Sequence, residues 1–347
     1  MRCAAPRLVP LLLAAAIGAQ SDAKFTSNRS SEPLAAEFSL DKAVTFMDDA
    51  ARMWNTKQGC VTCHTNGLYL IARATNGSSN QSPTYRETRK LANSYLKDYV
   101  SGGKSQKGQR GAVEGLVATA SFLAISDMAT HRRLSASTKA GLDHIWGLQS
   151  EGGAWSKWLK CRWPPYEVDD HFGVTLAAIA LGKTPPSYRR RKVTRAAEQR
   201  LRSYMNAHPP ANLHHKGMML WVAANLEDVI EPEQRDRWIR ELREHQRDDG
   251  GWRLSDLGDD RWRRPKDDAS KLPSDAYATG FTVFVLRQAG VAATDVALQR
   301  GLAWLRERQR VSGRWFVRSP RRDGKHYISH AATQFAVMAF ISCSQER

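Results

Sequence analysis

Hydrophobic positions along this 347-residue chain recur with helical spacing, in stretches of two alternating kinds. Six stretches are amphipathic and charged on one side, and each is followed by a run that is apolar and poor in charge. The amphipathic stretches are 40–53, 85–99, 136–148, 192–205, 232–245 and 295–308, and the apolar runs are 67–74, 112–126, 172–182, 218–226, 276–286 and 329–341. The period-two alternation of strands is scarce. We therefore predict an all-α protein of six helix pairs, each with an amphipathic outer helix and an inner helix covered on all sides.

The loops after three of the outer helices share one spacing: a Gln, a Gly four residues later, and a Trp two residues after the Gly. The copies are Gln149, Gly153 and Trp155; Gln246, Gly250 and Trp252; and Gln309, Gly313 and Trp315. In each copy the Gln ends an amphipathic pattern, and the Gly allows a turn before the next apolar run. Repetition of one helix pair predicts a single domain in which the pairs stack side by side.

These segments, at 139–155, 235–252 and 300–315, resemble the QW repeats of terpenoid cyclases, the family of squalene-hopene cyclase. That family shares its α/α toroid with the β subunits of protein prenyltransferases. The resemblance covers most of residues 137–343 and implies an (α/α)6 toroid over residues 39–345. If all outer-to-inner loops lie on one face, the starts of the inner helices surround one mouth of a central cavity. Polar residues there are candidates for a ligand site.

The first helix pair has a different motif in the corresponding loop. Cys60, Cys63 and His64 form a CxxCH run. Its two thiols can be alkylated by the vinyl groups of one haem, while the imidazole ligates the iron. The His distinguishes this run from the CxxC of thiol redox motifs and zinc sites. We predict covalently bound haem c at this loop, and a Cys60–Cys63 disulfide is the alternative interpretation.

The N-terminus has the pattern of an export signal. Arg2 and Arg7 precede or flank an apolar run from Leu8 to Ala19, which is too short to cross a bilayer. We predict a signal peptide at residues 1–23 and a flexible Ser- and Asn-rich leader at 24–38. The mature protein is then periplasmic or secreted, from a bacterium. In that compartment both haem attachment and disulfide formation are chemically available.

A haem iron held by His64 takes a second axial ligand from Met or His, or keeps an open position for chemistry. Ring closure places the last pair beside the first, so His326 and His330 are the nearer histidine candidates, and Met47 on the preceding helix competes with them. Each has a structural alternative. Met on an apolar helical face usually packs in the core, and His at a helix start is usually solvated or capping.

Glu167, Asp169 and Asp170 precede an inner helix and resemble the DxDD acid motif of class II terpene cyclases, with Glu at the first position. The resemblance implies that Asp169 protonates an alkene, which requires a carboxyl group kept protonated by its neighbours. A helix N-cap is the alternative role. The prenyltransferase zinc site is not matched, because Asp275-Ala276-Tyr277 lacks the Cys of that family's motif.

Composition narrows the classes of function. The net charge is +17 and 41% of residues are hydrophobic, enough for a sizeable core without disulfides. Export argues against nucleic acid as the partner of this basic surface and favours an acidic redox partner or an anionic surface. We expect electron transfer or haem-based redox chemistry at the cavity mouth. Two alternatives remain: an isoprenoid cyclase-like enzyme using Asp169, and a scaffold that binds an apolar molecule or a partner.

Overall fold

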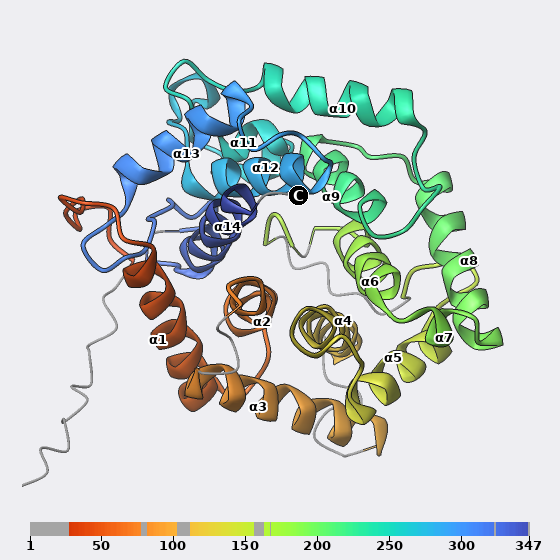
Figure 1. Cartoon of the computed structure of the whole chain (residues 1–347). Coiled ribbons are helices and arrows are strands. Elements are labelled where there is room, and N and C mark those ends of the chain that lie inside the picture. Colours follow the sequence, from red (N-terminus) through yellow and green to blue (C-terminus); the bar gives the residue numbers. More distant parts are fainter. Residues whose placement is uncertain are drawn as a thin grey trace, which may run out of the picture.

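A computed structural model describes residues 28–77, 82–102, 112–155, 163–166, 168–322 and 324–345, and every structural statement below concerns these residues. They form a closed ring of helices (Figure 1). The outer helices are α1 (Leu40–Gln58), α3 (Pro83–Val100), α5 (Ala136–Leu148), α8 (Lys192–Ala207), α10 (Pro232–Glu244) and α13 (Val296–Arg308). The inner helices are α2 (Asn66–Thr75), α4 (Ala112–His131), α6 (His171–Lys183), α9 (Leu213–Ala223), α12 (Ala276–Gln288) and α14 (Tyr327–Ser344). The predicted all-α toroid is confirmed, and its pairs are numbered one to six in chain order.

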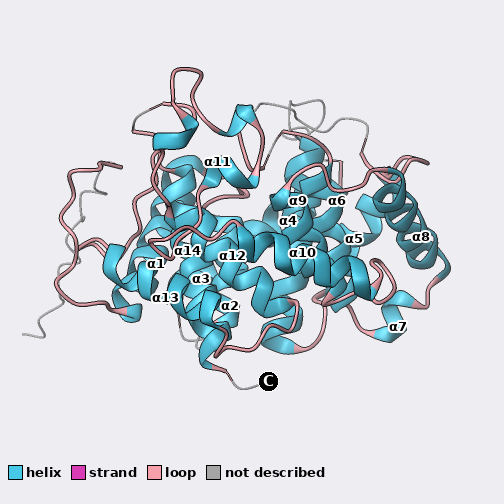
Figure 2. Ribbon diagram, turned by 90° about the horizontal axis from the view of Figure 1, so that it is seen from above, coloured by secondary structure: helices cyan, strands magenta, loops and turns pink. Residues whose placement is uncertain are grey.

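Short helices occupy the connections between these elements. They are α7 (Pro186–Arg189), α11 (Leu254–Leu257) and the 3-10 turns η2 (Asp260–Trp262) and η3 (Ala269–Lys271). Seen from the side, α11 and the long loops around it project from one face of the ring, while α7 and the C-terminus lie toward the other (Figure 2). We call the face that carries the outer-to-inner loops the rim.

The inner helices form a second, closed ring inside the first. Each one packs against two inner neighbours, and α14 closes the circle onto α2. An inner helix therefore has no solvent-facing side, which explains why residues 171–181 of α6 are all buried. At Gly280 of α12 a Cβ atom would lie 2.8 Å from the backbone nitrogen of Ala336, so glycine permits the close approach of α14.

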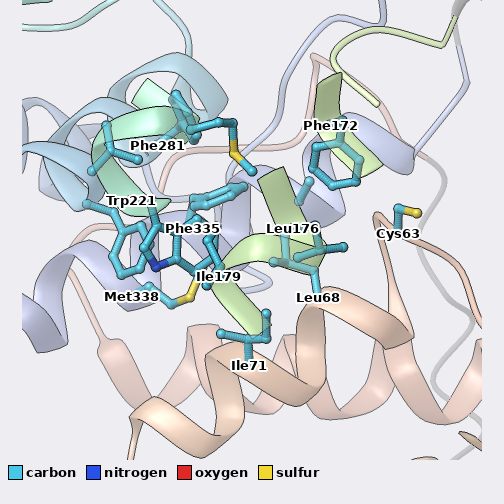
Figure 3. Close-up of a cluster of buried hydrophobic side chains, with 14 of the residues drawn as sticks. Cys63, Leu68, Ile71, Phe172, Leu176, Ile179, Trp221, Phe281, Phe335 and Met338 are labelled. Atoms are coloured by element: carbon cyan, nitrogen blue, oxygen red, sulfur yellow. The ribbon is translucent and has the colours of Figure 1, made fainter. Parts of the chain in front are cut away.

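The outer helices bury one side only. In α1 the buried side chains include Ala43, Phe46, Met47 and Ala50, at the spacing predicted for an amphipathic helix. Apolar side chains from several inner helices meet in the middle of the ring (Figure 3). One helix of the described chain, α4, is long and apolar enough to cross a membrane, but most of that stretch is buried inside the ring.

Each QW loop is tied to its own outer helix in the same way. The indole Nε1 of Trp155, Trp252 and Trp315 donates to a backbone carbonyl ten residues earlier, at 3.0, 2.6 and 2.7 Å. The amide Nε2 of the Gln donates to the carbonyl of the Gly, at 2.8, 2.8 and 3.0 Å. The recurring spacing thus produces a recurring hydrogen-bonded turn.

The same loops dock onto the next outer helix. Gly153, Gly250 and Gly313 have positive φ angles of 89°, 87° and 91°. A Cβ atom on these glycines would lie 2.1, 2.9 and 2.2 Å from a carbonyl oxygen of α8, α13 and α1, respectively. The third contact closes the ring. There Gln309 also accepts from the backbone nitrogen of Ser39 (2.8 Å) and donates to its carbonyl (2.9 Å), at the start of α1.

Residues 28–38, the described part of the predicted flexible leader, lie against pair six. The backbone nitrogen of Ala35 donates to the carbonyl of Gln309 (2.8 Å), and that of Val311 donates to the carbonyl of Pro33 (3.1 Å). Glu32 forms an ion pair with Arg314, whose side chain is 1% exposed. Polar composition suggested flexibility, but a buried charge far along the chain holds this segment in place. The predicted signal peptide at 1–23 lies outside the described residues.

Candidate functional site

The CxxCH motif lies in the rim loop of pair one, the position at which pairs three, five and six carry QW loops. α1 ends at Gly59, whose φ of 63° turns the chain directly into Cys60. The loop then folds around the fully buried side chain of Asn66. Its Oδ1 accepts from the backbone nitrogen of Thr62 (2.9 Å), and its Nδ2 donates to the carbonyl of Cys60 (2.8 Å) and to Asn55 Oδ1 (2.9 Å). The single side chain of Asn66 therefore organises this loop, whereas a Gln and a Trp together organise each QW loop.

The two thiols of the motif differ in exposure. Cys63 is 7% exposed, whereas Cys60 is half-buried. Figure 3 places Cys63 at the edge of the apolar cluster, with its Sγ directed away from the other labelled side chains. The motif therefore lies at the boundary between the core of the ring and its rim.

Thr65 bridges two imidazoles that belong to opposite ends of the chain. Its Oγ1 lies 2.7 Å from Nδ1 of His64 and 3.0 Å from Nδ1 of His330 in α14. Thr65 precedes α2, where a threonine hydroxyl commonly caps the helix, but it makes no capping hydrogen bond. The Thr65 hydroxyl therefore hydrogen-bonds the two histidines and does not cap the helix.

This bridge links the protonation of the two rings. A hydroxyl has a single hydrogen and two acceptor lone pairs, so Thr65 can donate to only one of the two imidazoles and accepts an Nδ1–H from at least one of them. The ring that donates keeps its lone pair on Nε2, and the ring that accepts carries its proton on Nε2. At least one of His64 and His330 therefore presents an Nε2 lone pair while the bridge is intact.

Aromatic side chains surround the His64 ring. Its ring centre lies within 6.5 Å of those of Trp54 (5.4 Å), Tyr327 (5.6 Å), His326 (6.4 Å) and Tyr166 (6.5 Å). Burial, followed by repulsion from the nearby His326 and Lys325, lowers the pKa of His64 to about 3. The imidazole is therefore neutral at neutral pH, which is the form that binds metals.

Residues 163–166, in the connection that leads into α6 of pair three, reach across the rim to pairs one and six. The hydroxyl of Tyr327 donates to the carbonyl of Pro164 (3.1 Å), and the ring of Trp163 lies 4.9 Å from that of Tyr327. Tyr166 contacts His64 on one side and Tyr277 of pair five on another. Four pairs thus converge on the CxxCH loop.

The residues present fit a covalent haem in their chemistry. Two thiols stand next to a neutral imidazole whose Nδ1 is occupied, and no described residue hydrogen-bonds to its Nε2. Metal-bound histidines commonly have their other ring nitrogen held in this way. The rings of Trp54, Tyr166 and Tyr327 stand so close to His64 that a porphyrin there would pack against them or displace them.

The three predicted axial candidates occupy different surroundings. Met47 is 1% exposed and belongs to the apolar core. His330 uses its Nδ1 in the Thr65 bridge. His326 stands at the start of α14 next to the His64 ring, and its buried Nε2 has no hydrogen-bond partner in the described part of the chain. Of the three candidates, His326 therefore has the ring nitrogen best able to act as a metal ligand next to His64.

The acidic motif lies on pair three. Glu167 falls outside the described residues. Asp169 accepts from the backbone nitrogen of His171 (3.0 Å), and its Oδ2 lies 3.3 Å from Nε2 of His215. Burial raises the pKa of Asp169, but these hydrogen bonds and the His215 charge outweigh it and leave the pKa below its usual range. This environment disfavours the protonated acid that a cyclase requires. Asp170 directly precedes α6 and makes no side-chain capping bond.

Two histidines stack beside Asp169. The rings of His171 and His215 are 3.8 Å apart and within 9° of parallel. His215 has both nitrogens engaged, because its Nδ1 accepts from the backbone of Ala211 (3.4 Å). His171 is 4% exposed, and neither of its ring nitrogens has a partner among the described residues. Burial lowers its pKa to about 3. No group of three or more His, Cys, Asp or Glu in the described chain is arranged to hold a metal ion.

Several residues of the site escaped prediction. Asn66 and Thr65 follow the motif directly, where Thr and Asn ordinarily signal a helix start. Trp54 is one amphipathic-helix residue among many. Tyr166 reaches His64 only because residues 163–166 cross the rim. The adjacency of Thr65 and Asn66 to CxxCH was the one local signal available.

Comparisons with known proteins identify the fold. No family model matches the chain, and no curated protein matches it. A polysaccharide lyase is similar in structure, with a TM-score of 0.53 and 11% identity over 87% of this chain and 97% of its own. An unsaturated glucuronyl hydrolase from Bacillus sp. GL1, responsible for glycosaminoglycan degradation, has a TM-score of 0.53 and 12% identity over 86% and 96%. A type II terpene cyclase from Scytonema has a TM-score of 0.48 and 12% identity over 88% and 98%.

The likeness at such low identity is one of fold alone: the chain shares an α/α toroid with these enzymes. At this level of identity the likeness gives no information about the chemistry of this chain.

Proposed function

We propose that this chain is an exported c-type haem protein in which Cys60 and Cys63 form the thioether bonds and His64 is an axial ligand. The observation that carries the proposal is the contact of His64 Nδ1 with Thr65, which leaves Nε2 available beside two thiols. When bound, the haem supplies one-electron redox chemistry. The chain's own residues hold the imidazole neutral, restrict water with Trp54, Tyr166 and Tyr327, and fix the loop through Asn66.

In this proposal His326, whose buried Nε2 has no hydrogen-bond partner in the described chain, would be the second residue to hold the iron. The ring centres of His64 and His326 are separated by 6.4 Å, with planes at 68°. With Nδ1–H of His64 donated to Thr65, the Thr65 hydroxyl donates to His330, and His330 becomes a positioning residue.

The test is the covalent haem itself. The full chain is produced in a periplasm with haem-attachment machinery, and the purified protein is examined by pyridine haemochrome spectroscopy and mass spectrometry. We expect one haem per chain, and none in the variant Cys60→Ser/Cys63→Ser. The matched control is Cys343→Ser, at the far end of α14, which should retain the haem. A wild-type protein without covalent haem would refute the proposal.

The role of Thr65 has a separate readout. Thr65→Val keeps the shape of the side chain and removes the bridge, so the imidazole of His64 loses its Nδ1 partner. Loss of that partner makes a histidine ligand less basic. We expect the haem to remain attached and its reduction potential to rise, as measured by spectroelectrochemical titration. An unchanged potential would show that the bridge has no influence on the ligand.

An acid–base enzyme of the cyclase type is the second candidate. It rests on the position of Asp169 at the start of an inner helix, beside His171, which is buried and whose ring nitrogens have no partner among the described residues. The lowered pKa of Asp169 is the observation that ranks this candidate second. Wild-type protein would then convert squalene or a shorter isoprenoid, and Asp169→Asn would abolish the product. Absence of product from every such substrate would count against this candidate, whatever the haem content.

A further inference from the structure

We propose that a second site, independent of the CxxCH loop, binds an acidic sugar of the uronate type. It is a cavity of about 360 Å3 between pairs five and six, where the loop leading to α12, the end of α13 and the loop leading to α14 meet. Its volume lies at the lower end of the range of small-molecule pockets, about 300–1,000 Å3. A short carbohydrate acid is of suitable size.

Aromatic rings form much of the wall. Trp262 of η2, Trp304 of α13 and the consecutive Trp315 and Phe316 of the loop before α14 all line the cavity. Trp262 and Trp315 are almost completely buried, at 1% and 0% exposure, so the wall is firmly packed. Aromatic faces and edges suit the apolar face of a sugar ring, as they suit other ring-shaped ligands.

Arginines form the other part of the lining. Arg308 is exposed and lies over the Trp304 ring at 5.9 Å, and Arg310 is half-buried over Phe316 at 5.8 Å. Burial lowers the pKa of Arg310, and repulsion from Arg314 and Arg308 lowers it further, whereas Glu32 acts in the opposite direction. Closely spaced guanidinium groups are stabilised by an anion, and a carboxylate matches their geometry.

The acidic residues of the lining are already engaged. Asp249 accepts from the backbone of Gly251 (3.0 Å), from Ser274 (2.8 Å) and from Trp304 Nε1 (3.1 Å). Asp267 pairs with Arg318. Asp275 accepts from the backbone of Ala278 and Leu254. The three acidic charges therefore serve the loop structure. Arg310 donates to the carbonyl of Glu32, and Arg308 and Arg310 form no ion pair in the described chain, so both remain as cations for an anionic ligand.

Buried polar atoms around the cavity lack partners. The indole Nε1 of Trp262, the hydroxyl of Ser255 and Nε of Arg310 each have no hydrogen-bond partner in the described structure. A buried donor without an acceptor costs about 1–3 kcal/mol. The residues around the cavity are therefore polar as well as aromatic, which suits a sugar acid better than a purely apolar acid.

The experiment compares two probes that differ only in the carboxylate. Methyl β-D-glucuronide and methyl β-D-glucoside are titrated into the full-length protein by isothermal calorimetry at low salt, and chemical shifts of tryptophan indoles are followed by NMR. We expect the glucuronide to bind at least tenfold more tightly than the glucoside and to shift the Trp262 indole signal. Equal affinities for the two probes would overturn the proposal, and so would the absence of glucuronide binding at about 10 mM ligand.

Two neighbouring arginines provide a matched pair of variants. Arg308 and Arg306 are both exposed in the last turn of α13, and each lies over an aromatic ring, but only Arg308 lines the cavity. We expect Arg308→Gln to weaken glucuronide binding about tenfold and Arg306→Gln to leave it unchanged. Equal losses in both variants would indicate a nonspecific charge effect and refute the site. The haem content of the same samples tests the other proposal separately.

Discussion

The rim of this ring contains two kinds of loop that solve one structural problem differently. In pairs three, five and six, a Gln and a Trp bind the loop to its own outer helix, and a Gly presses it against the next outer helix. In pair one, Asn66 alone organises the loop, and the residues between α1 and α2 are thiols and an imidazole. The QW loops join one pair to the next, whereas the CxxCH loop is held from within and from pair six.

This difference indicates which rim loop can carry reactive side chains. In a QW loop the Gln amide and the Trp indole are engaged in holding the loop to its outer helix, so these two side chains are already committed to structure. Pair one receives its clamp from pair six, through Gln309 and Gly313 against the start of α1. Its own rim loop is organised by Asn66 in place of a Gln and a Trp, and it carries two thiols and an imidazole.

The largest expected effect concerns ring closure. Gly313→Ala places a Cβ 2.2 Å from the carbonyl of Lys42 at a φ of 91°, so we expect the free energy of unfolding to fall by about 3 kcal/mol or more. Gly290→Ala is the control, since it has the same φ but no atom within 4 Å, and should cost about 1 kcal/mol. Urea denaturation measures both. Equal losses would mean that the QW glycine makes no closing contact.

The next comparison exchanges the organising amides. Asn66→Leu leaves the backbone of Cys60 and Thr62 without partners, and Gln309→Leu does the same to Ser39 and Gly313. Each should lower the unfolding free energy by about 2–3 kcal/mol. Only Asn66→Leu should also reduce the yield of covalent haem, measured by haemochrome absorbance per chain. Similar haem yields in the two variants would remove the distinction between the loops.

A smaller effect depends on pH, at the start of α6. Because the folded pKa of His171 is about 3 and its unfolded value is about 6.5, the unfolded chain binds more protons between these values. Stability therefore falls as the pH drops below about 6.5, by about 1.4 kcal/mol per unit. His171→Phe should reduce the loss between pH 7 and pH 5 by about 2 kcal/mol. Denaturation curves with the same acid sensitivity in both proteins would contradict this.

The smallest effect is expected in the QW loop of pair five. Hydrogen bonds from Gly251, Ser274 and Trp304 overcome the effect of burial and hold the pKa of Asp249 below its usual range. Its contribution is present above pH about 4 and is lost as the carboxylate is protonated. Since the group is exposed, Asp249→Asn should cost only about 0.5 kcal/mol at pH 7. The neighbouring Asp248→Asn should cost nothing, and a difference that persists at pH 3 would exclude the charge as its origin.

Prediction from the sequence succeeded where neighbouring residues carry the information. The apolar runs located all six inner helices, and the Gln-Gly-Trp spacing marked three turns with the same hydrogen bonds. It failed where composition was the only guide: residues 28–38 have a polar, linker-like sequence, yet Glu32 binds a buried arginine of pair six. The acidic motif is a mixed case, since Asp169 stands at the predicted helix start but is paired with His215.

Helix periodicity, caps and turn glycines depend on residues within about one or two turns of each other, so the amino-acid sequence alone specifies the six pairs and their order. The position of the CxxCH motif in the first rim loop follows from that order. The spatial neighbours of the motif do not follow from that order. Thr65 meets His330 across 265 residues, and Tyr327 meets Pro164 across 163. Contacts between residues so far apart in the sequence form only once the ring has closed. The neighbours of His64 are therefore seen in the folded chain and cannot be read from the sequence pattern.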